Sequence, residues 1–401
     1  MMQRLRVALL GNAANEHTMR WARWLAAHRH EVLLVTDRES TDPVPGVKEV
    51  RIEPEGWQRA KLWLRRGDVF AWNGMKGESA GPHLREFAPD VVHSLDAVGW
   101  GEALSAAPRG SARVLMPWGS DVLWWPKRSW AARRIVRRAM RLAHAVTGNG
   151  PGLEEELAAL GAERAAMYMF SWGASDVYFT LPSRREVEGW REVLGIAPGT
   201  RIVLSPRSAK GHLGAARILR GWAHWRREAP ESQSALVLLR GHATDRDWSS
   251  VLAMKDKLVT DDSVRVVDRL LGWRELLPLY HLADAAVMMP RTDFRSLTML
   301  EFMACGVFPI LAPLPAYRGR VADMGAEPEA PVRGVLLGGH SPQALAEGLS
   351  RWDRLADDDL APLLEGNRRA MQAEERFSVN APKIIEVYDR ALRRARARSR
   401  A

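Results

Sequence analysis

The chain has 401 residues, of which 46% are hydrophobic, so it is long enough to bury two ordinary cores. Its 58 basic and 48 acidic residues give a net charge of +10, which predicts attraction to phosphates, anionic lipids or nucleic acid. The single cysteine excludes a disulfide framework and a cysteine-based metal site. The first apolar run is too short for a signal peptide, and no run reaches membrane-spanning length. We therefore expect a cytoplasmic protein.

Short apolar runs alternate with amphipathic helical segments along both halves of the chain. This alternation predicts two doubly wound, Rossmann-like α/β domains facing across a cleft. We place the first domain at residues 1–180, with a C-terminal helix over 377–395 packing back on it, and the second at 195–376. The expected strands are 5–10, 31–36, 90–94, 113–116, 145–148 and 165–170, then 202–205, 236–239, 264–267, 285–289, 307–311 and 332–337.

The first strand runs into a turn of small residues that begins at Gly11, where a ligand can approach the backbone. The turn lacks the Gly-x-Gly-x-x-Gly spacing of a dinucleotide site, which argues against an oxidoreductase. His17 follows the turn, and we interpret it as a structural residue at a helix start. For His93, at the end of a later strand, a structural and a cleft role are equally open.

Two segments combine aromatic and basic residues. In residues 54–88 the tryptophans form either a helical core, which we favour, or a basic aromatic surface for a lipid acceptor. Residues 129–145 form a strongly basic amphipathic helix. We interpret its charged side as a solvated face. The alternative is a peripheral contact with an anionic membrane, at the inner membrane face. No nucleic-acid-binding module is present, so we expect no nucleic-acid partner.

The most informative stretch is Met289–Ile310, which is predicted to fold as a strand end, a polar loop, a helix and the next strand. Asp293 lies in the loop and Glu301 in the helix, and Ser296 is placed to cap that helix. The amides near Arg295, Ser296 and Leu297 would attract phosphate. Phosphate on the amides and hydroxyls on the carboxylates would suit a nucleotide sugar. The alternative is that the two acids only offset the helix dipole.

The sequence of this stretch resembles the signature of retaining GT-B glycosyltransferases of family 4. That signature is an acid, seven further residues, and then Glu in a Glu-Ala-Met-Ala-Cys-Gly run. Here the acids are Asp293 and Glu301, and Phe302 replaces the first Ala. The resemblance implies that Glu301 holds the nucleotide ribose and that Asp293 lies near the donor sugar. Phe294 and Arg295 replace small residues of the family pattern. They would admit an anionic donor such as a uronic acid, block the pocket, or turn away from it.

The resemblance extends to other loops of the chain. It implies that Arg207 and Lys210 clamp the donor diphosphate. It also places Asp121, in a Trp-Gly-Ser-Asp loop, near the reacting sugar and acceptor, although a turn or N-cap aspartate is an equal alternative. Tyr317 departs from the family pattern.

These observations predict a retaining, metal-independent hexosyltransferase that uses a nucleotide-diphosphate sugar and no cofactor. The acceptor would be a glycan, a lipid-linked sugar or a small molecule. The alternatives are a GT-B enzyme of other chemistry, such as a pseudo-glycosyltransferase or a nucleotide-sugar epimerase, and a catalytically silent relative that only binds.

Overall fold

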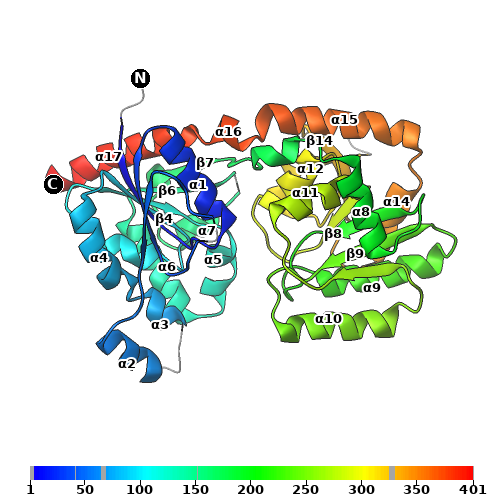
Figure 1. The fold of residues 1–401 in the computed structure, drawn as a ribbon, viewed down its shortest axis with the longest axis horizontal. Coiled ribbons are helices and arrows are strands. Elements are labelled where there is room, and N and C mark those ends of the chain that lie inside the picture. The colour runs from blue at the N-terminus through cyan, green and yellow to red at the C-terminus, as the bar shows by residue number, and fades with distance from the viewer. Residues whose placement is uncertain (1–3, 41, 65–68, 151, 325–329, 401) are drawn as a thin grey trace. The chain divides into compact units, whose positions relative to one another are not determined.

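The computed structural model describes residues 4–40, 42–64, 69–150, 152–324 and 330–400. The chain divides into two compact units, Met1–Ser171 with Asn380–Ala401, and Trp172–Val379. Each unit is a parallel sheet with helices packed on it (Figure 1). Residues 172–180, which we predicted to belong to the first domain, are therefore part of the second unit.

The sheet of the first unit has the strand order β3-β2-β1-β4-β5-β6-β7. Adjacent strands pair in parallel throughout, and the three central strands are almost entirely buried. Sequence periodicity missed the edge strand β3 because its residues alternate between half-buried and exposed and are mostly polar. The strands are β1 (Arg6–Leu10), β2 (Glu31–Thr36), β3 (Val47–Arg51), β4 (Val91–Leu95), β5 (Ala112–Met116), β6 (Ala145–Asn149) and β7 (Met167–Phe170).

The helices of the first unit differ from prediction in two places. Trp57 is 54% exposed, so at this position the predicted tryptophan core of residues 54–88 is wrong. The C-terminal helix α17 (Lys383–Arg400) extends beyond its predicted end at residue 395, where Arg394 and Arg398 both pair with Glu163. The other helices are α1 (Glu16–Ala27), α2 (Trp57–Leu64), α3 (Val69–Asn73), α4 (Lys76–Phe87), α5 (Ser120–Leu123), α6 (Trp130–Leu142) and α7 (Glu154–Ala159).

Helix α17 contacts β5 and β6 and is joined to β4 by one buried hydrogen bond (Figure 1). His93 Nδ1 lies 2.8 Å from the hydroxyl of Tyr388. Both side chains are fully buried, and burial lowers the pKa of His93 to about 3. His93 is therefore neutral and has a structural role, which resolves the two interpretations left open by the sequence.

The sheet of the second unit has the strand order β10-β9-β8-β11-β12-β14-β13. Helices α9, α10 and α14 supply a core of large apolar residues to one face, and α11 and α12 lie on the other (Figure 1). The strands are β8 (Arg201–Ser205), β9 (Ser234–Leu239), β10 (Val264–Val267), β11 (Ala285–Met288), β12 (Phe308–Leu311), β13 (Val321–Asp323) and β14 (Val332–Leu336). The helices are α8 (Arg184–Leu194), α9 (Ala215–Glu228), α10 (Asp245–Leu258), α11 (Trp273–Leu282), α12 (Leu297–Ala304), α13 (Pro315–Arg318), α14 (Pro342–Asp353), α15 (Asp357–Glu374) and α16 (Phe377–Asn380).

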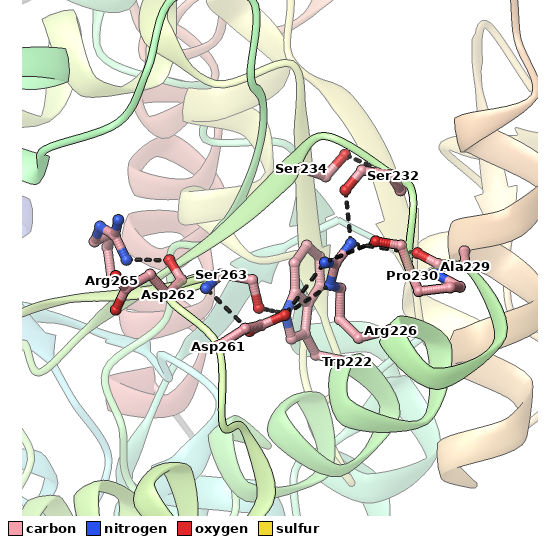
Figure 2. Close-up of polar contacts among 10 residues, drawn as sticks. All are labelled: Trp222, Arg226, Ala229, Pro230, Ser232, Ser234, Asp261, Asp262, Ser263 and Arg265. Carbon is pink, nitrogen blue, oxygen red and sulfur yellow. Dashed lines mark hydrogen bonds and ion pairs between the residues drawn. The ribbon is translucent and has the colours of Figure 1, made fainter.

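At the amino ends of β9 and β10, charged groups are paired within the protein (Figure 2). Arg226 binds Asp261 Oδ2 through Nε and Nη2, both at 3.2 Å, and its Nη1 donates to the carbonyl of Ser232 at 2.6 Å. Asp261 also accepts from the amide of Ser263, whose hydroxyl accepts from Trp222 Nε1 at 3.0 Å. The guanidinium of Arg226 thus links the segments that precede β9 and β10 at this end of the sheet.

At the opposite edge, one glycine fixes the distance between two loops. Gly214 precedes α9 with φ of +105°, and a Cβ atom there would lie 2.3 Å from the carbonyl oxygen of Met289, at the end of β11. The loop after β8 can therefore approach the end of β11 only because residue 214 has no side chain.

We expect Gly214→Ala to lower the free energy of unfolding by about 1–3 kcal/mol, because alanine strains the backbone at this φ and also collides with Met289. Gly211→Ala is the matched control in the same loop, since a Cβ there meets nothing within 4 Å and should change stability by less than about 0.5 kcal/mol. Urea unfolding of the two variants checks this, and equal stabilities would contradict it.

Candidate active site

The strand order of the second unit places two loops at a topological switch point. β8 and β11 are neighbours in the sheet, although β9 and β10 lie between them in sequence, so the connections after β8 and β11 leave in opposite directions. Ligands of doubly wound sheets bind at this point, outside the carboxyl ends of the strands. The loop after β8 carries Arg207 and Lys210, and the loop after β11 carries Asp293 and Ser296.

Arg207 connects these two loops directly. Its Nη1 donates to the hydroxyl of Ser296 at 2.6 Å, and its Nη2 lies 3.4 Å from Asp293 Oδ2. The side chains of Arg207 and Asp293 are 20% and 10% exposed, so the ion pair is largely shielded from solvent. Among the described residues, Arg207 Nε is buried without a hydrogen-bond partner. The structure therefore brings together three of the residues that the sequence singled out.

Ser296 occupies the predicted N-cap position of α12, but its side chain makes no cap hydrogen bond. Its hydroxyl accepts from Arg207 instead, so the prediction of a side-chain cap is wrong. The first-turn amides, beginning at Leu297, have no carbonyl partner within the helix and stay available to an anion. The Leu297 side chain is buried, so any contact of this residue with a ligand would be made by its amide.

Tyr317 holds Asp293 from the other side. Its hydroxyl donates to Asp293 Oδ2 at 2.7 Å, and the Tyr317 side chain is fully buried. Burial, followed by the negative charge of Asp293, raises the pKa of Tyr317 well above its ordinary value, so the hydroxyl stays protonated and remains a donor. The sequence marked Tyr317 only as a departure from the family pattern, and its partner lies 24 residues earlier.

Lys210 is a half-buried cation without a matching acid. In the described part of the chain its ammonium group has neither an ion-pair nor a hydrogen-bond partner, and Asp247 acts on it only at longer range. Burial and then the charge of Arg207 lower the pKa of Lys210. This edge of the sheet thus differs from the opposite edge, where Arg226 is fully paired (Figure 2). A bound anion would compensate the two neighbouring cations.

Glu301 lies in the second turn of α12, and its residue is 9% exposed. Its carboxylate is close to Tyr280 and Cys305. Burial first, and then the charge of Glu301, raises the pKa of both side chains. A nearly buried acid one turn from the free amides has the position expected of a group that accepts hydrogen bonds from ligand hydroxyls.

Phe294 and Arg295 both have partners within the protein. Phe294 is 4% exposed, so its ring is part of the packed interior. Arg295 Nη1 donates to Glu375 Oε1 at 3.2 Å, and Arg320 pairs with the same oxygen at 2.7 Å. The guanidinium is engaged by a carboxylate of the chain itself, which removes the physical basis for selecting an anionic donor. The backbone amide of Arg295 remains a predicted phosphate contact.

In the first unit the topological switch point lies between β1 and β4. The backbone amides of the turn after β1 donate hydrogen bonds within the protein. The amide of Gly11 donates to the carbonyl of Val35 at 3.1 Å, and that of Ala13 to Thr36 Oγ1 at 3.0 Å. The amide of Gly11 is therefore not available to a ligand, and the approach of a ligand to the backbone at Gly11 stays a prediction. Asn15 accepts from the amide of His17 and caps α1, so His17 occupies the helix start that the sequence indicated.

Asp121 joins the loops after β4 and β5. Its carboxylate accepts from the amides of Ala97 at 2.7 Å, Trp118 at 2.9 Å and Gly119 at 2.8 Å. It is 2% exposed, and burial, together with the charge of Asp96, raises its pKa to about 7. This geometry is that of the turn aspartate that the sequence left as an alternative. A direct role at the acceptor stays a prediction.

Two further properties of the described residues bear on metal binding and on membrane insertion. No three histidine, cysteine or acidic side chains gather there in a group able to hold a metal ion. None of the helices in this part of the chain combines the length and apolar character needed to cross a bilayer.

Comparisons with known proteins agree with this architecture. Residues 12–173 match the family described as glycosyl transferase 4-like domain. The fold is similar to sucrose-phosphate synthase from Thermosynechococcus elongatus (17% identity, TM-score 0.75, covering 96% of this chain and 98% of that one). It is also similar to HepE from Anabaena in complex with UDP and glucose (13%, 0.70, 96% and 99%) and to a glycosyltransferase from Rickettsia africae (12%, 0.72, 97% and 99%). No curated protein matches the chain.

Together with the two parallel sheets, these similarities show the GT-B fold, built from two Rossmann-like units. Residues 12–173, which lie almost entirely in the first unit, are similar to the glycosyl transferase 4-like domain.

Proposed function

We propose that the chain is a retaining glycosyltransferase that transfers a sugar from a nucleotide-diphosphate donor to a glycan, a lipid-linked sugar or a small molecule. The observation that carries the proposal is the pair of neighbouring cations at the switch point of the second unit, one of which, Lys210, has no acidic partner among the described residues. A diphosphate supplies the missing charge, and its negative charge grows as the bond to the sugar breaks.

Each side chain of this site has a role in the proposed reaction. Arg207 and Lys210 hold the diphosphate, together with the amides of Ser296 and Leu297. Asp293, fixed by Tyr317 and Arg207, lies by the donor sugar, and Glu301 accepts from the ribose hydroxyls. The two cations perform the charge neutralisation that a metal ion performs in other transferases, so we propose a metal-independent reaction without a cofactor. The protein would act in the cytoplasm.

The direct test of this proposal is a panel of UDP-, ADP- and GDP-linked sugars, with the released nucleoside diphosphate as the readout and the product structure as a second readout. Release with a new glycosidic bond supports transfer. An altered sugar that stays on its nucleotide would show an epimerase, a product joined without a glycosidic bond would show a pseudo-glycosyltransferase, and binding without release would show a silent relative.

Glu301→Ala should weaken nucleotide binding by about 1.5–3 kcal/mol, the value of a hydrogen bond to a charged group. Calorimetry with a nucleoside diphosphate and its 2′,3′-dideoxy analogue separates this bond from a general effect on the fold. If Glu301 binds the ribose, the substitution costs little with the dideoxy ligand. An equal loss with both ligands would refute the assignment.

Arg207→Ala should lower kcat by about 10²–10³-fold and weaken donor binding less, because charge on the leaving diphosphate is greatest in the transition state. Arg207→Lys keeps the charge but loses the planar contact to Ser296, so we expect partial recovery. Arg246→Ala, on the exposed surface of α10, is the matched control and should leave kcat unchanged. A change confined to KM would mean that Arg207 binds only ground-state phosphate.

We also propose a peripheral contact between the first unit and an anionic membrane. Helix α6 buries its apolar residues in the unit and exposes Trp130, which is 79% accessible. The basic residues beside it are also exposed: Arg133, Arg134, Arg137, Arg138 and Arg141. A largely accessible indole next to clustered guanidinium groups suits the headgroup region of an anionic bilayer.

Trp130→Ala should reduce sedimentation with vesicles of phosphatidylcholine and phosphatidylglycerol several-fold, because the indole no longer enters the interface. Trp273→Ala, at an exposed tryptophan of the second unit, is the control and should bind as wild type does. Equal binding to vesicles of pure phosphatidylcholine, or binding that does not fall with salt, would contradict an electrostatic contact.

A further inference from the structure

The chain passes between the two units at Ser171/Trp172 and at Val379/Asn380. Just inside the second unit, residues 172–176 and 375–378 lie side by side, and we call these two segments the crossover pair. The amide of Ala174 donates to the carbonyl of Glu375 at 2.7 Å, and the amide of Phe377 to that of Ala174 at 2.8 Å. Asp176 Oδ1 accepts from the hydroxyl of Ser378 at 2.6 Å. Both passages are thus joined to each other by backbone and side-chain bonds.

One glycine shows how closely the two segments approach. Gly173 has φ of +72°, and a Cβ atom there would lie 2.6 Å from the carbonyl carbon of Arg376. No other residue type can occupy position 173 while this pairing persists.

Glu375 places a carboxylate at an electrostatically unfavourable position in this pair. It is the C-cap of α15, an 18-residue helix, where the helix dipole is negative, and its side chain is 2% exposed. A buried charge at such a position requires positive partners. Arg295, at 3.2 Å, and Arg320, at 2.7 Å, supply positive charge to it.

Both cations come from segments that form the proposed donor site. Arg295 lies between Phe294 and Ser296, in the loop after β11. Arg320 follows α13, three residues after Tyr317, which holds Asp293. We call residues 293–296 the donor loop. Its polar side chains form hydrogen bonds with three different segments: Asp293 with Tyr317, Arg295 with Glu375, and Ser296 with Arg207.

We propose that Glu375 is a positioning residue that couples the donor loop to the crossover pair through Arg295. Ordering of the donor loop strengthens the pairing of Ala174 and Phe377 with the opposite segment, and by thermodynamic reciprocity the paired crossover favours the ordered loop. The ligand-dependent half of this coupling rests on the proposed function, because the ligand is the nucleotide diphosphate.

The test is hydrogen exchange at the amides of Ala174 and Phe377, which donate the two backbone bonds of the crossover pair. In the absence of ligand, Glu375→Gln should speed exchange at these amides about tenfold, because the two guanidinium groups lose the charge that they share. Glu365→Gln is the matched control: the same substitution on the same helix, at a carboxylate that is 49% exposed and pairs with Arg368 and Arg369, should change exchange by less than about twofold. The amide of Leu236, in β9, reports global opening and should be unaffected.

If Glu375→Gln does not fold, the double variant Arg295→Gln/Glu375→Gln removes one charge of each sign and should fold with the same fast exchange at the crossover. Equal exchange in the Glu375 and Glu365 variants, or acceleration at Leu236 of the same size, would overturn the coupling.

A second arm uses UDP, ADP and GDP as probes. The nucleotide that binds should slow exchange at Ala174 and Phe377 in the wild type several-fold and have no such effect in Glu375→Gln. Binding without this protection would overturn the coupling and leave the proposed function intact. Failure of all three nucleotides to bind would refute the proposed function, while the ligand-free arm still decides whether Glu375 ties the loop to the crossover.

Discussion

The positive charge of Lys210 is the constraint on which the candidate site depends. Burying part of an ammonium group beside a guanidinium costs free energy through both desolvation and repulsion. At Arg226, in the same unit, groups of the protein compensate such a charge, because the guanidinium binds Asp261 and backbone carbonyls. At the carboxyl ends of β8 and β11, Arg207 pairs with Asp293, whereas the ammonium group of Lys210 has no acidic partner among the described residues. The remaining charge makes this edge of the sheet a site for an anion, and the free amides at the start of α12 act in the same direction.

The two units use their switch points differently. In the first unit, the amides of the turn after β1 are bonded to neighbouring strands, and Asp121 binds amides of the loops after β4 and β5. Its loops are thus held mainly by their own hydrogen bonds. In the second unit, the donor loop is held by side chains from distant segments. The first-turn amides of α12, which follows this loop, stay available to an anion. The functional proposal accordingly rests on the second unit, and the roles of the first-unit loops remain predictions.

Much of the fold follows from local patterns. Alternating apolar runs predicted the buried strands of both sheets, and only strands with a weak apolar signal, such as β3, were missed. The spacing of Asp293 and Glu301 predicted that both would lie near the start of one helix, as they do. Local patterns could not predict partners: Tyr317 reaches Asp293 across 24 residues, and Glu375 reaches Arg295 across 80. For this reason the sequence could not predict that the Ser296 hydroxyl accepts from Arg207, or that Glu375 binds the guanidinium of Arg295.

The central claim is that the cations after β8 bind a diphosphate. Calorimetric titration of UDP, ADP and GDP, each beside its monophosphate, into the wild type and Lys210→Met tests it most directly. The account predicts that at least one diphosphate binds about tenfold or more tightly than its monophosphate, as expected for an added charged hydrogen bond, and that the difference is lost in Lys210→Met. Equal affinity for mono- and diphosphate in the wild type, or a preference that survives in Lys210→Met, would contradict it.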